Sequence, residues 1–313
     1  MILQYKTGKY TVPIKQPELS LILCDLYDKF NTKKFGPFYI PDIFLKFVRI
    51  VAKSFNQKPK IKTYRYEYTY KCNNKKVLLG FSGGLDSCYQ ALQLRRKGYN
   101  VSLYYCMGMN KYENGQADRY VHEFAKKFKF NLIIMKMSGV KYWAENPIKN
   151  QLLLAFMIDY CKEHKYGYIS LGDDFNLSIK DAVPGTNTTD AREVTKAFLN
   201  PINIKLLPVK GNKLSRIKYL HKYNVEYYSC VAPGRFHKKW HDYNSKKYSV
   251  KLPEGNCGSC RKCCMHWLLE NSNNAEFEKH CWEIMYRTKY NADAYLFSPN
   301  IPLKQRRKNL LTY

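Results

Sequence analysis

Acidic residues are scarce in this chain. Its 313 residues hold 25 Asp and Glu against 53 Lys and Arg, which gives a formal net charge of +28. Solubility alone does not require so large an excess, so one interpretation is a polyanionic partner such as nucleic acid. The other is the compositional bias of an AT-rich genome, which places Lys where Glu or Gln would serve. The charge by itself does not choose between the two.

Long apolar runs are missing as well. No stretch approaches the roughly 20 apolar residues that span a bilayer, and the residues after Met1 lack the basic and then apolar order of a secretion signal. We therefore expect a cytoplasmic protein with no membrane partner. Apolar residues still make up 45% of the chain, which is enough to build a core.

Two common phosphate-binding motifs are absent, and a third pattern stands in their place. The sequence has neither the Gly-Lys-Ser/Thr of a Walker loop nor the three-glycine dinucleotide fingerprint. It does have the apolar run Val77 to Phe81, followed by Ser82-Gly83-Gly84-Leu85-Asp86-Ser87. This order predicts a strand, a glycine turn that lets a phosphate approach the backbone, and a helix whose N-terminal amides face the anion.

Each polar side chain of this loop has a chemical role in that hypothesis. The hydroxyls of Ser82 and Ser87 donate to phosphate oxygens, and Asp86 either caps the helix or holds a Mg²⁺ that bridges the pyrophosphate. We predict that Asp86 and Ser87 are catalytic. The predicted ATP-binding residues are Phe81, Ser82, Gly83, Gly84, Leu85, Asp86 and Ser87. The structural alternative is an ordinary Gly-Gly turn that enters a helix.

Short apolar runs alternate with amphipathic stretches from Lys76 onwards, which is typical of an α/β fold around a parallel sheet. We expect an N-terminal extension at 1–75, a core at 76–215 and a metal-binding helical region at 216–313. In the extension, two apolar stretches each suit a helix, at Leu19–Leu26 and Ile43–Val51. The expected core strands are Val77–Phe81, Val101–Cys106, Leu132–Met137 and Tyr168–Leu171, and the expected helices are Asp86–Lys97, Gln116–Phe128 and Ile148–His164.

Cysteines concentrate near the C-terminal end, where four of the eleven lie between Cys257 and Cys264. This clustering suits a metal site in a reducing compartment better than disulfides. Cys257, Cys260 and Cys263 are spaced so that their thiols converge, and Cys230 is the upstream candidate for a fourth ligand. Competing ligands are Cys264, His266, His237 and His241. We predict structural Zn²⁺, with an iron–sulfur cluster as the alternative.

The loop Ser-Gly-Gly-x-Asp-Ser after a strand resembles the PP-loop of enzymes that cleave ATP between the α and β phosphates. Together with the cysteines, it is similar to the 7-cyano-7-deazaguanine synthase (QueC) family, which has this loop and a later zinc site of Ser-Cys followed by Cys-Gly-x-Cys-x-x-Cys. The resemblance implies a Rossmann-like parallel sheet of the PP-loop (adenine nucleotide alpha hydrolase-like) type with a C-terminal zinc-binding helical region. It covers roughly residues 76–267.

The resemblance also implies substrate residues. The segment Pro147 to Leu154 looks like the family's Arg-Asn helix start, with Lys149 in place of the Arg. We assign Lys149 a catalytic contact to phosphate or adenylate, with a solvated helix start as the alternative. The implied substrate-binding residues are Asn150, Asp173, Asp174, Asp190 and Arg192. The chain departs from the family in its N-terminal extension, in a missing Tyr-Ser-Gly-Tyr-Pro run and in the 26 residues between Cys230 and Cys257.

The activity implied by the resemblance is an ATP-dependent ligase reaction. A carboxylate, 7-carboxy-7-deazaguanine in the family, is adenylated with release of pyrophosphate, and ammonia then gives the amide and finally the nitrile, as a step of queuosine or other 7-deazaguanine biosynthesis. The implied cofactors are ATP, Mg²⁺ and Zn²⁺, and the family's homodimers imply a second copy as a partner. Alternatives are a tRNA-modifying PP-loop enzyme of the thiolation type, for which Cys88 is the only cysteine near the loop, another acceptor, and a nucleic-acid-binding protein that grips phosphates with residues 235–248.

Overall fold

The computed structural model of this chain describes residues 1–6, 8–31, 37–54, 58–67, 75–108, 116–139, 148–172, 191–202, 204–228, 230, 234–253, 255–270, 273–287 and 294–312. Two compact units divide these residues. Unit 1 comprises 1–80, 93–110 and 130–209, and unit 2 comprises 81–92, 111–129 and 210–313. The chain therefore crosses between the units several times, and the four residues between Gly80 and Leu85 lie in unit 2.

A seven-stranded sheet forms the centre of unit 1, with the order β1-β2-β7-β6-β5-β8-β9. Its five parallel strands lie side by side in the order β7-β6-β5-β8-β9. When these strands are numbered along the chain from β5, the spatial order is 3-2-1-4-5, which is the beginning of the Rossmann order. The strands are β1 (Ile2–Tyr5), β2 (Gly8–Thr11), β5 (Lys76–Gly80), β6 (Asn100–Met107), β7 (Asn131–Ser138), β8 (Tyr168–Leu171) and β9 (Leu206–Leu207). The predicted α/β class and the four predicted core strands are confirmed, each strand end to within one residue.

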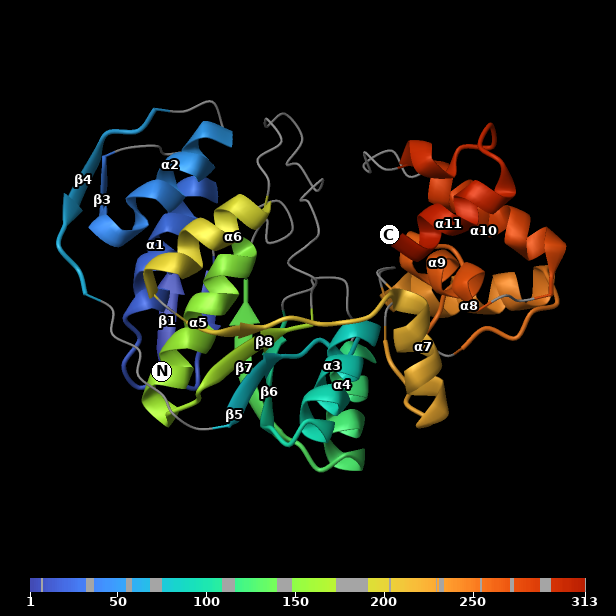
Figure 1. Cartoon of the computed structure of the whole chain (residues 1–313), viewed down its shortest axis with the longest axis horizontal. Coiled ribbons are helices and arrows are strands. Elements are labelled where there is room, and N and C mark those ends of the chain that lie inside the picture. Colours follow the sequence, from blue (N-terminus) through green and yellow to red (C-terminus); the bar gives the residue numbers. More distant parts are fainter. Residues whose placement is uncertain are drawn as a thin grey trace. The chain divides into compact units, whose positions relative to one another are not determined.

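Four helices of unit 1 pack in two pairs, α1 with α5 and α2 with α6 (Figure 1). Helix α5 is buried on nearly all sides, which explains why its sequence is apolar rather than amphipathic. The helices of this unit are α1 (Leu19–Asn31), α2 (Leu45–Ser54), α5 (Lys149–His164) and α6 (Ala191–Leu199), with short 3₁₀ turns at Asp42–Phe44 and Asn200–Ile202. A separate two-stranded parallel sheet pairs β3 (Phe38–Pro41) with β4 (Ile61–Tyr64).

The N-terminal residues are part of the core of unit 1. Strand β2 pairs with β7, with Tyr10 opposite Met137, and the Tyr10 side chain is fully buried 5.7 Å from the ring of Phe156. The buried carboxylate of Asp159 on α5 caps α1, because it accepts the amide of Ser20 at 2.8 Å and its hydroxyl at 2.6 Å. The predicted extension therefore completes the fold of this unit.

Unit 2 is largely helical, and its C-terminal part is shown in orange and red in Figure 1. Helix α3 (Leu85–Arg96) begins in this unit. The others are α4 (Gln116–Lys127), α7 (Lys213–Lys222), α8 (Gly234–Lys247), α9 (Arg261–Leu269), α10 (Ala275–Arg287) and α11 (Leu303–Thr312), with a 3₁₀ turn at Ala294–Phe297. The 26 residues that separate Cys230 from Cys257 hold helix α8.

Candidate active site and cysteine cluster

The predicted phosphate loop, Phe81 to Ser87, follows the carboxyl end of β5. Strands β5 and β8 pair with Gly80 opposite Leu171, and the order of the sheet reverses between them, which is where open α/β sheets bind ligands. After Gly80 the chain turns through Gly83, whose φ of +71° suits only glycine without strain, and helix α3 begins at Leu85. A Cβ atom on Gly83 would lie 3.1 Å from Val121 Cγ2. The strand, loop and helix predicted from the sequence are all present.

The two loop hydroxyls converge. Ser82 Oγ and Ser87 Oγ lie 3.3 Å apart, and the amide of Gly84 lies 3.4 Å from Ser82 Oγ. Ser87 is buried and donates to the carbonyl of Gly84 at 3.1 Å, whereas Ser82 is exposed. The loop thus gathers hydroxyl and amide donors at the N-terminus of α3, which is the arrangement that an anion such as phosphate needs.

Asp86 is paired with an arginine that sequence reasoning did not find. Arg216 on α7 donates through Nη1 to Asp86 Oδ1 at 2.6 Å and through Nη2 to the carbonyl of Gly211 at 2.6 Å. The Arg216 side chain is only 3% exposed, while that of Asp86 is 28% exposed. The structure thus places a buried cation on one oxygen of Asp86, and the two roles predicted for this residue, helix cap and Mg²⁺ ligand, stay predictions. No motif in the sequence marks Arg216, which lies 130 residues further along the chain.

The loop is also tied to the segment that carries the first cysteine of the cluster. The amide of Tyr228 donates to the carbonyl of Gly83 at 2.8 Å. The ring of Tyr228 packs 5.6 Å from that of Tyr120 on α4, and Phe81 packs 5.0 Å from Phe124 on the same helix. Because Cys230 is two residues beyond Tyr228, loop and cysteines share one scaffold within unit 2.

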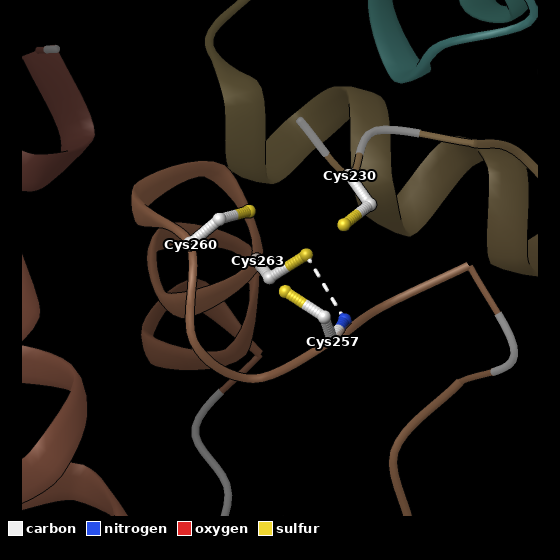
Figure 2. A group of neighbouring side chains, drawn as sticks. All are labelled: Cys230, Cys257, Cys260 and Cys263. Atoms are coloured by element: carbon white, nitrogen blue, oxygen red, sulfur yellow. Dashed lines mark hydrogen bonds between the residues drawn. The ribbon is translucent and has the colours of Figure 1, made fainter. Parts of the chain in front are cut away.

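The four predicted metal ligands come together. The sulfurs of Cys230, Cys257, Cys260 and Cys263, which we call the cysteine cluster, all lie within 4.8 Å of one another (Figure 2). Three of the residues are buried and Cys260 is half-buried. Tetrahedral zinc with bonds of about 2.3 Å holds its sulfurs about 3.8 Å apart, which lies within this limit. The set of four thiols therefore fits Zn²⁺, and it also fits the thiolate ligation of an iron–sulfur cluster.

Backbone amides already point at these sulfurs. The amide of Cys257 donates to Cys263 Sγ at 3.3 Å, as the dashed line in Figure 2 shows, and the amide of Ser259 donates to Cys257 Sγ at 3.4 Å. Such bonds stabilise thiolates. A hydrogen bond from Cys230 holds the pKa of Cys257 below its usual value, and the same hydrogen bond raises the pKa of Cys230. A bound cation would let all four ionise.

The competing ligands lie outside this set. The thiol of Cys264 points to the carbonyl of Gly258 at 3.5 Å, and the ring of His266 packs 5.6 Å from that of Tyr227. On α8, His237 packs against Tyr228, and His241 contacts Asp242 and the carbonyl of Leu252. Among the described residues, only the cysteine cluster gathers three or more potential metal ligands.

A cavity of about 380 Å³ in unit 2 is bordered by Cys263 and by a group of titratable side chains. His266, Tyr227 and Glu270 line it, and Tyr227 is hydrogen-bonded to Glu270. Burial lowers the pKa of His266 to about 3, with Lys213 lowering it further and Asp86 acting in the opposite direction. Burial also raises the pKa of Glu270. The imidazole that lines this cavity is therefore neutral near pH 7.

The remaining predicted site residues belong to other parts of the chain. Lys149 and Asn150 lie in the first turn of α5 and Arg192 lies in α6, with Asn150 exposed. Asp173, Asp174 and Asp190 fall outside the described residues. The side chains of Lys149 and Arg192 also fall outside what is described, so the assignments of all six residues stay predictions.

Cys88 is placed where it cannot serve as an accessible nucleophile. It is fully buried on α3, and burial raises the pKa of its thiol well above the usual value. A reactive cysteine needs a lowered pKa and access to substrate. The sulfur-transfer role considered for this residue therefore has no support from its surroundings.

No protein-family model matches the chain, and no curated protein matches it. Among solved structures, it is similar to a predicted subunit of tRNA methyltransferase from Methanocaldococcus jannaschii, at 17% identity over 47% of this chain and 75% of that one, with a TM-score of 0.31. It is also similar to the U34-tRNA thiolase NcsA from Methanococcus maripaludis with its [4Fe-4S] cluster, at 17% identity over 74% of this chain and 82% of that one, with a TM-score of 0.36. Both scores are low, so neither likeness supports a function for this chain. In the described part of the chain, no helix is long and apolar enough to cross a membrane.

Proposed function

We propose that this protein is an ATP-dependent, AMP-forming enzyme that adenylates an acceptor oxygen at the loop Ser82 to Ser87. The observation that carries the proposal is the placement of this loop. It follows β5 at the point where the sheet order reverses, and it opens α3 with two hydroxyls and the amide of Gly84 together. This combination suits a polyphosphate whose terminal part leaves as pyrophosphate.

The residues of the loop have separate tasks in this reaction. The acceptor oxygen attacks the α-phosphorus of ATP, and the bond between that phosphorus and the bridging oxygen to the β-phosphate breaks. Ser82 and the amides at the start of α3 hold the departing pyrophosphate, and Ser87 joins them when its hydroxyl turns from the carbonyl of Gly84 to the phosphate. Since Asp86 Oδ1 accepts from Arg216, its Oδ2 is the oxygen that would hold Mg²⁺. When bound, that ion neutralises charge on the pyrophosphate.

The first candidate acceptor is a small-molecule carboxylate, 7-carboxy-7-deazaguanine. It rests on the resemblance of the loop and the cysteine spacing to the 7-cyano-7-deazaguanine synthase family. The carboxylate would become an acyl adenylate, ammonia would displace AMP to give the amide, and a second ATP would activate the amide oxygen so that its loss leaves the nitrile. The residues proposed to contact this substrate are Asn150, Asp173, Asp174, Asp190 and Arg192, with Lys149 on the adenylate.

The second candidate acceptor is a base oxygen of a nucleic acid, as in tRNA modification. The observation that favours it is the net charge of +28, since a chain with this charge attracts polyanions. The burial of Cys88 argues against sulfur transfer through that residue. In both versions the cysteine cluster has a structural role, because its ligands complete a tetrahedral set and a closed site leaves no position for substrate.

Pyrophosphate exchange tests the adenylation step directly. Purified protein with Mg-ATP and labelled pyrophosphate should return label to ATP when the correct acceptor is present, and the acceptors to compare are 7-carboxy-7-deazaguanine and total tRNA. Mass spectrometry should then find AMP, with amide or nitrile if the carboxylate is correct. The matched variant is Asp86→Asn, which keeps a hydrogen-bond acceptor for Arg216 and removes the charge that would hold Mg²⁺. Exchange that persists at the wild-type rate in this variant would remove Asp86 from the site.

A further inference from the structure

Helix α8 has an exposed stripe in which two aromatic side chains lie between basic ones. Trp240 is 39% exposed and Tyr243 is 50% exposed, and their rings lie 5.9 Å apart, edge to face. At about 100° per residue along a helix, they fall in one third of the circumference together with three exposed lysines. This stacking stripe consists of Lys239, Trp240, Tyr243, Lys246 and Lys247.

The opposite face of α8 is fastened to the cysteine cluster. Asn244 donates through Nδ2 to the carbonyl of Cys257 at 2.9 Å and to Ser259 Oγ at 2.7 Å. His241 contacts the carbonyl of Leu252 at 3.2 Å, and His237 is buried. The helix is therefore held in one orientation by the loop that carries the cysteines, and the stripe faces away from that loop. This rigid support keeps the two rings in place for a ligand.

The chemistry of the stripe selects one class of ligand. Flat rings that stand free of the core stack on unpaired bases, and lysines beside them neutralise phosphates. Lys247 Nζ lies 5.6 Å from the centroid of the Tyr243 ring, so cation and ring act at one position. A helix that lies in a membrane surface needs a broad apolar face, and the stripe of α8 has only its two rings, with no Leu, Ile, Val or Met anywhere in Gly234–Lys247.

We propose that the stacking stripe of α8 binds single-stranded nucleic acid, with bases on Trp240 and Tyr243 and phosphates on Lys239, Lys246 and Lys247. This inference deepens the proposed function, because it names nucleic acid as the acceptor class and α8 as the surface where it docks. The acceptor role rests on the proposed function. The stripe itself needs neither ATP nor turnover to bind. The segment between Cys230 and Cys257, which is longer than in the 7-cyano-7-deazaguanine synthase family and contains α8, then serves as a nucleic-acid contact.

Fluorescence anisotropy with a labelled single-stranded oligonucleotide of about 20 nucleotides tests the proposal on the whole 313-residue chain, loaded with metal. The double variant Trp240→Ala/Tyr243→Ala should bind the oligonucleotide roughly 30-fold more weakly than the wild type, or worse. The conservative single variant Trp240→Phe should keep most of the wild-type affinity. Tyr39→Ala, which removes a tyrosine that is 65% exposed in unit 1, should leave binding unchanged. Equal affinity of the wild type and the double variant would overturn the proposal.

A matched pair of charge variants separates a local site from general attraction. Lys246→Gln/Lys247→Gln on α8 and Lys304→Gln/Lys308→Gln on α11 each remove two exposed charges. Only the first pair should reduce the steepness of the plot of log affinity against log salt concentration, with the slope falling in magnitude by about 1.4. Equal effects of both pairs, or binding to vesicles with 30% phosphatidylserine but not to the oligonucleotide, would overturn the proposal. Pyrophosphate exchange at a saturating concentration of the acceptor that supports it should survive every variant, because none of them changes the loop Ser82 to Ser87, so a failed stripe leaves the adenylation proposal standing.

Discussion

Arg216 and Asp86 form an ion pair at 2.6 Å in which the cation is buried and the anion is partly open to water. The arginine has a second bond to the carbonyl of Gly211, so its position is set by the start of α7. The pair joins the first turn of α3 to α7 within unit 2. Loss of the Asp86 carboxylate therefore leaves a buried guanidinium without its anion.

Replacing Asp86 separates chemistry from stability. Asp86→Ala leaves a buried guanidinium without its carboxylate, and we expect a loss of about 2 kcal/mol in the free energy of unfolding. Asp86→Asn keeps an oxygen for Arg216, so we expect a smaller loss of stability and the same loss of pyrophosphate release. Denaturant titration and AMP formation, measured on both variants, check this. Full stability of Asp86→Ala would show that the pair contributes nothing to the fold.

His266 should make unit 2 sensitive to acid. Its pKa is lowered from an ordinary 6.5 to about 3, chiefly by burial, so between these values the unfolded chain binds a proton that the folded chain does not. Stability from this residue is therefore present above about pH 6.5 and is lost as the pH falls. From pH 7 to pH 5 the expected loss is about 2 kcal/mol.

Denaturant titrations at pH 5, 6 and 7 measure this loss. His266→Gln should have a flatter pH dependence than the wild type, while His122→Gln, which removes an exposed imidazole from α4, should follow the wild type. The comparison isolates His266, because any acid release of metal affects all three proteins alike. If His266→Gln loses stability as steeply as the wild type, the imidazole is not buried as described.

Local pattern was enough to predict the parallel core. Its strands are runs of apolar residues between turns, so β6 and β7 were located to within one residue from the sequence. The pairing of β2 with β7 was not predicted, because it joins residues more than 120 positions apart and leaves no local signal. The same is true of Asp159, which caps α1 from a helix far along the chain.

The candidate site shows the same division. Cys257, Cys260 and Cys263 lie on one short turn, so their convergence follows from spacing alone. Cys230 was predicted as the fourth ligand because it is the nearest upstream cysteine, but the sequence did not show the tertiary contact near it, in which the amide of Tyr228 bonds to the carbonyl of Gly83. Arg216 went unnoticed for a related reason: an arginine in a basic helix is ordinarily solvated, and only the fold shows that this one is buried.

Metal content distinguishes ligand from neighbour in the cysteine cluster. Cys263→Ser should lose the bound metal and reduce the stability of unit 2, because a structural metal contributes folding free energy. Cys264→Ser changes the adjacent buried thiol, which lies outside the cluster, and should keep the metal. Elemental analysis of both variants gives the stoichiometry, expected at one zinc per chain. An absorbance band near 400 nm together with bound iron would show that the cysteines hold an iron–sulfur cluster and not zinc. Equal metal content in both variants would contradict the ligand set.

Gly83 and Gly98 offer a comparison between strain and collision. Both have positive φ, +71° and +80°, but a Cβ on Gly83 would lie 3.1 Å from Val121 Cγ2, whereas one on Gly98 would meet nothing within 4 Å. Each change to Ala should cost about 1 kcal/mol of stability from backbone strain. Only Gly83→Ala should also weaken ATP binding, measured by calorimetry, because relief of the contact displaces the loop amides.

The added variant Val121→Ala tests that mechanism. In the Gly83→Ala background it removes the methyl that the new Cβ meets, so ATP binding should recover in part even though the protein becomes less stable through the lost burial of Val121. Affinity and stability would then move in opposite directions, which simple unfolding does not produce. Unchanged ATP binding in Gly83→Ala would mean that the phosphates do not rest on this turn, and the adenylation site would have to be sought elsewhere in the chain.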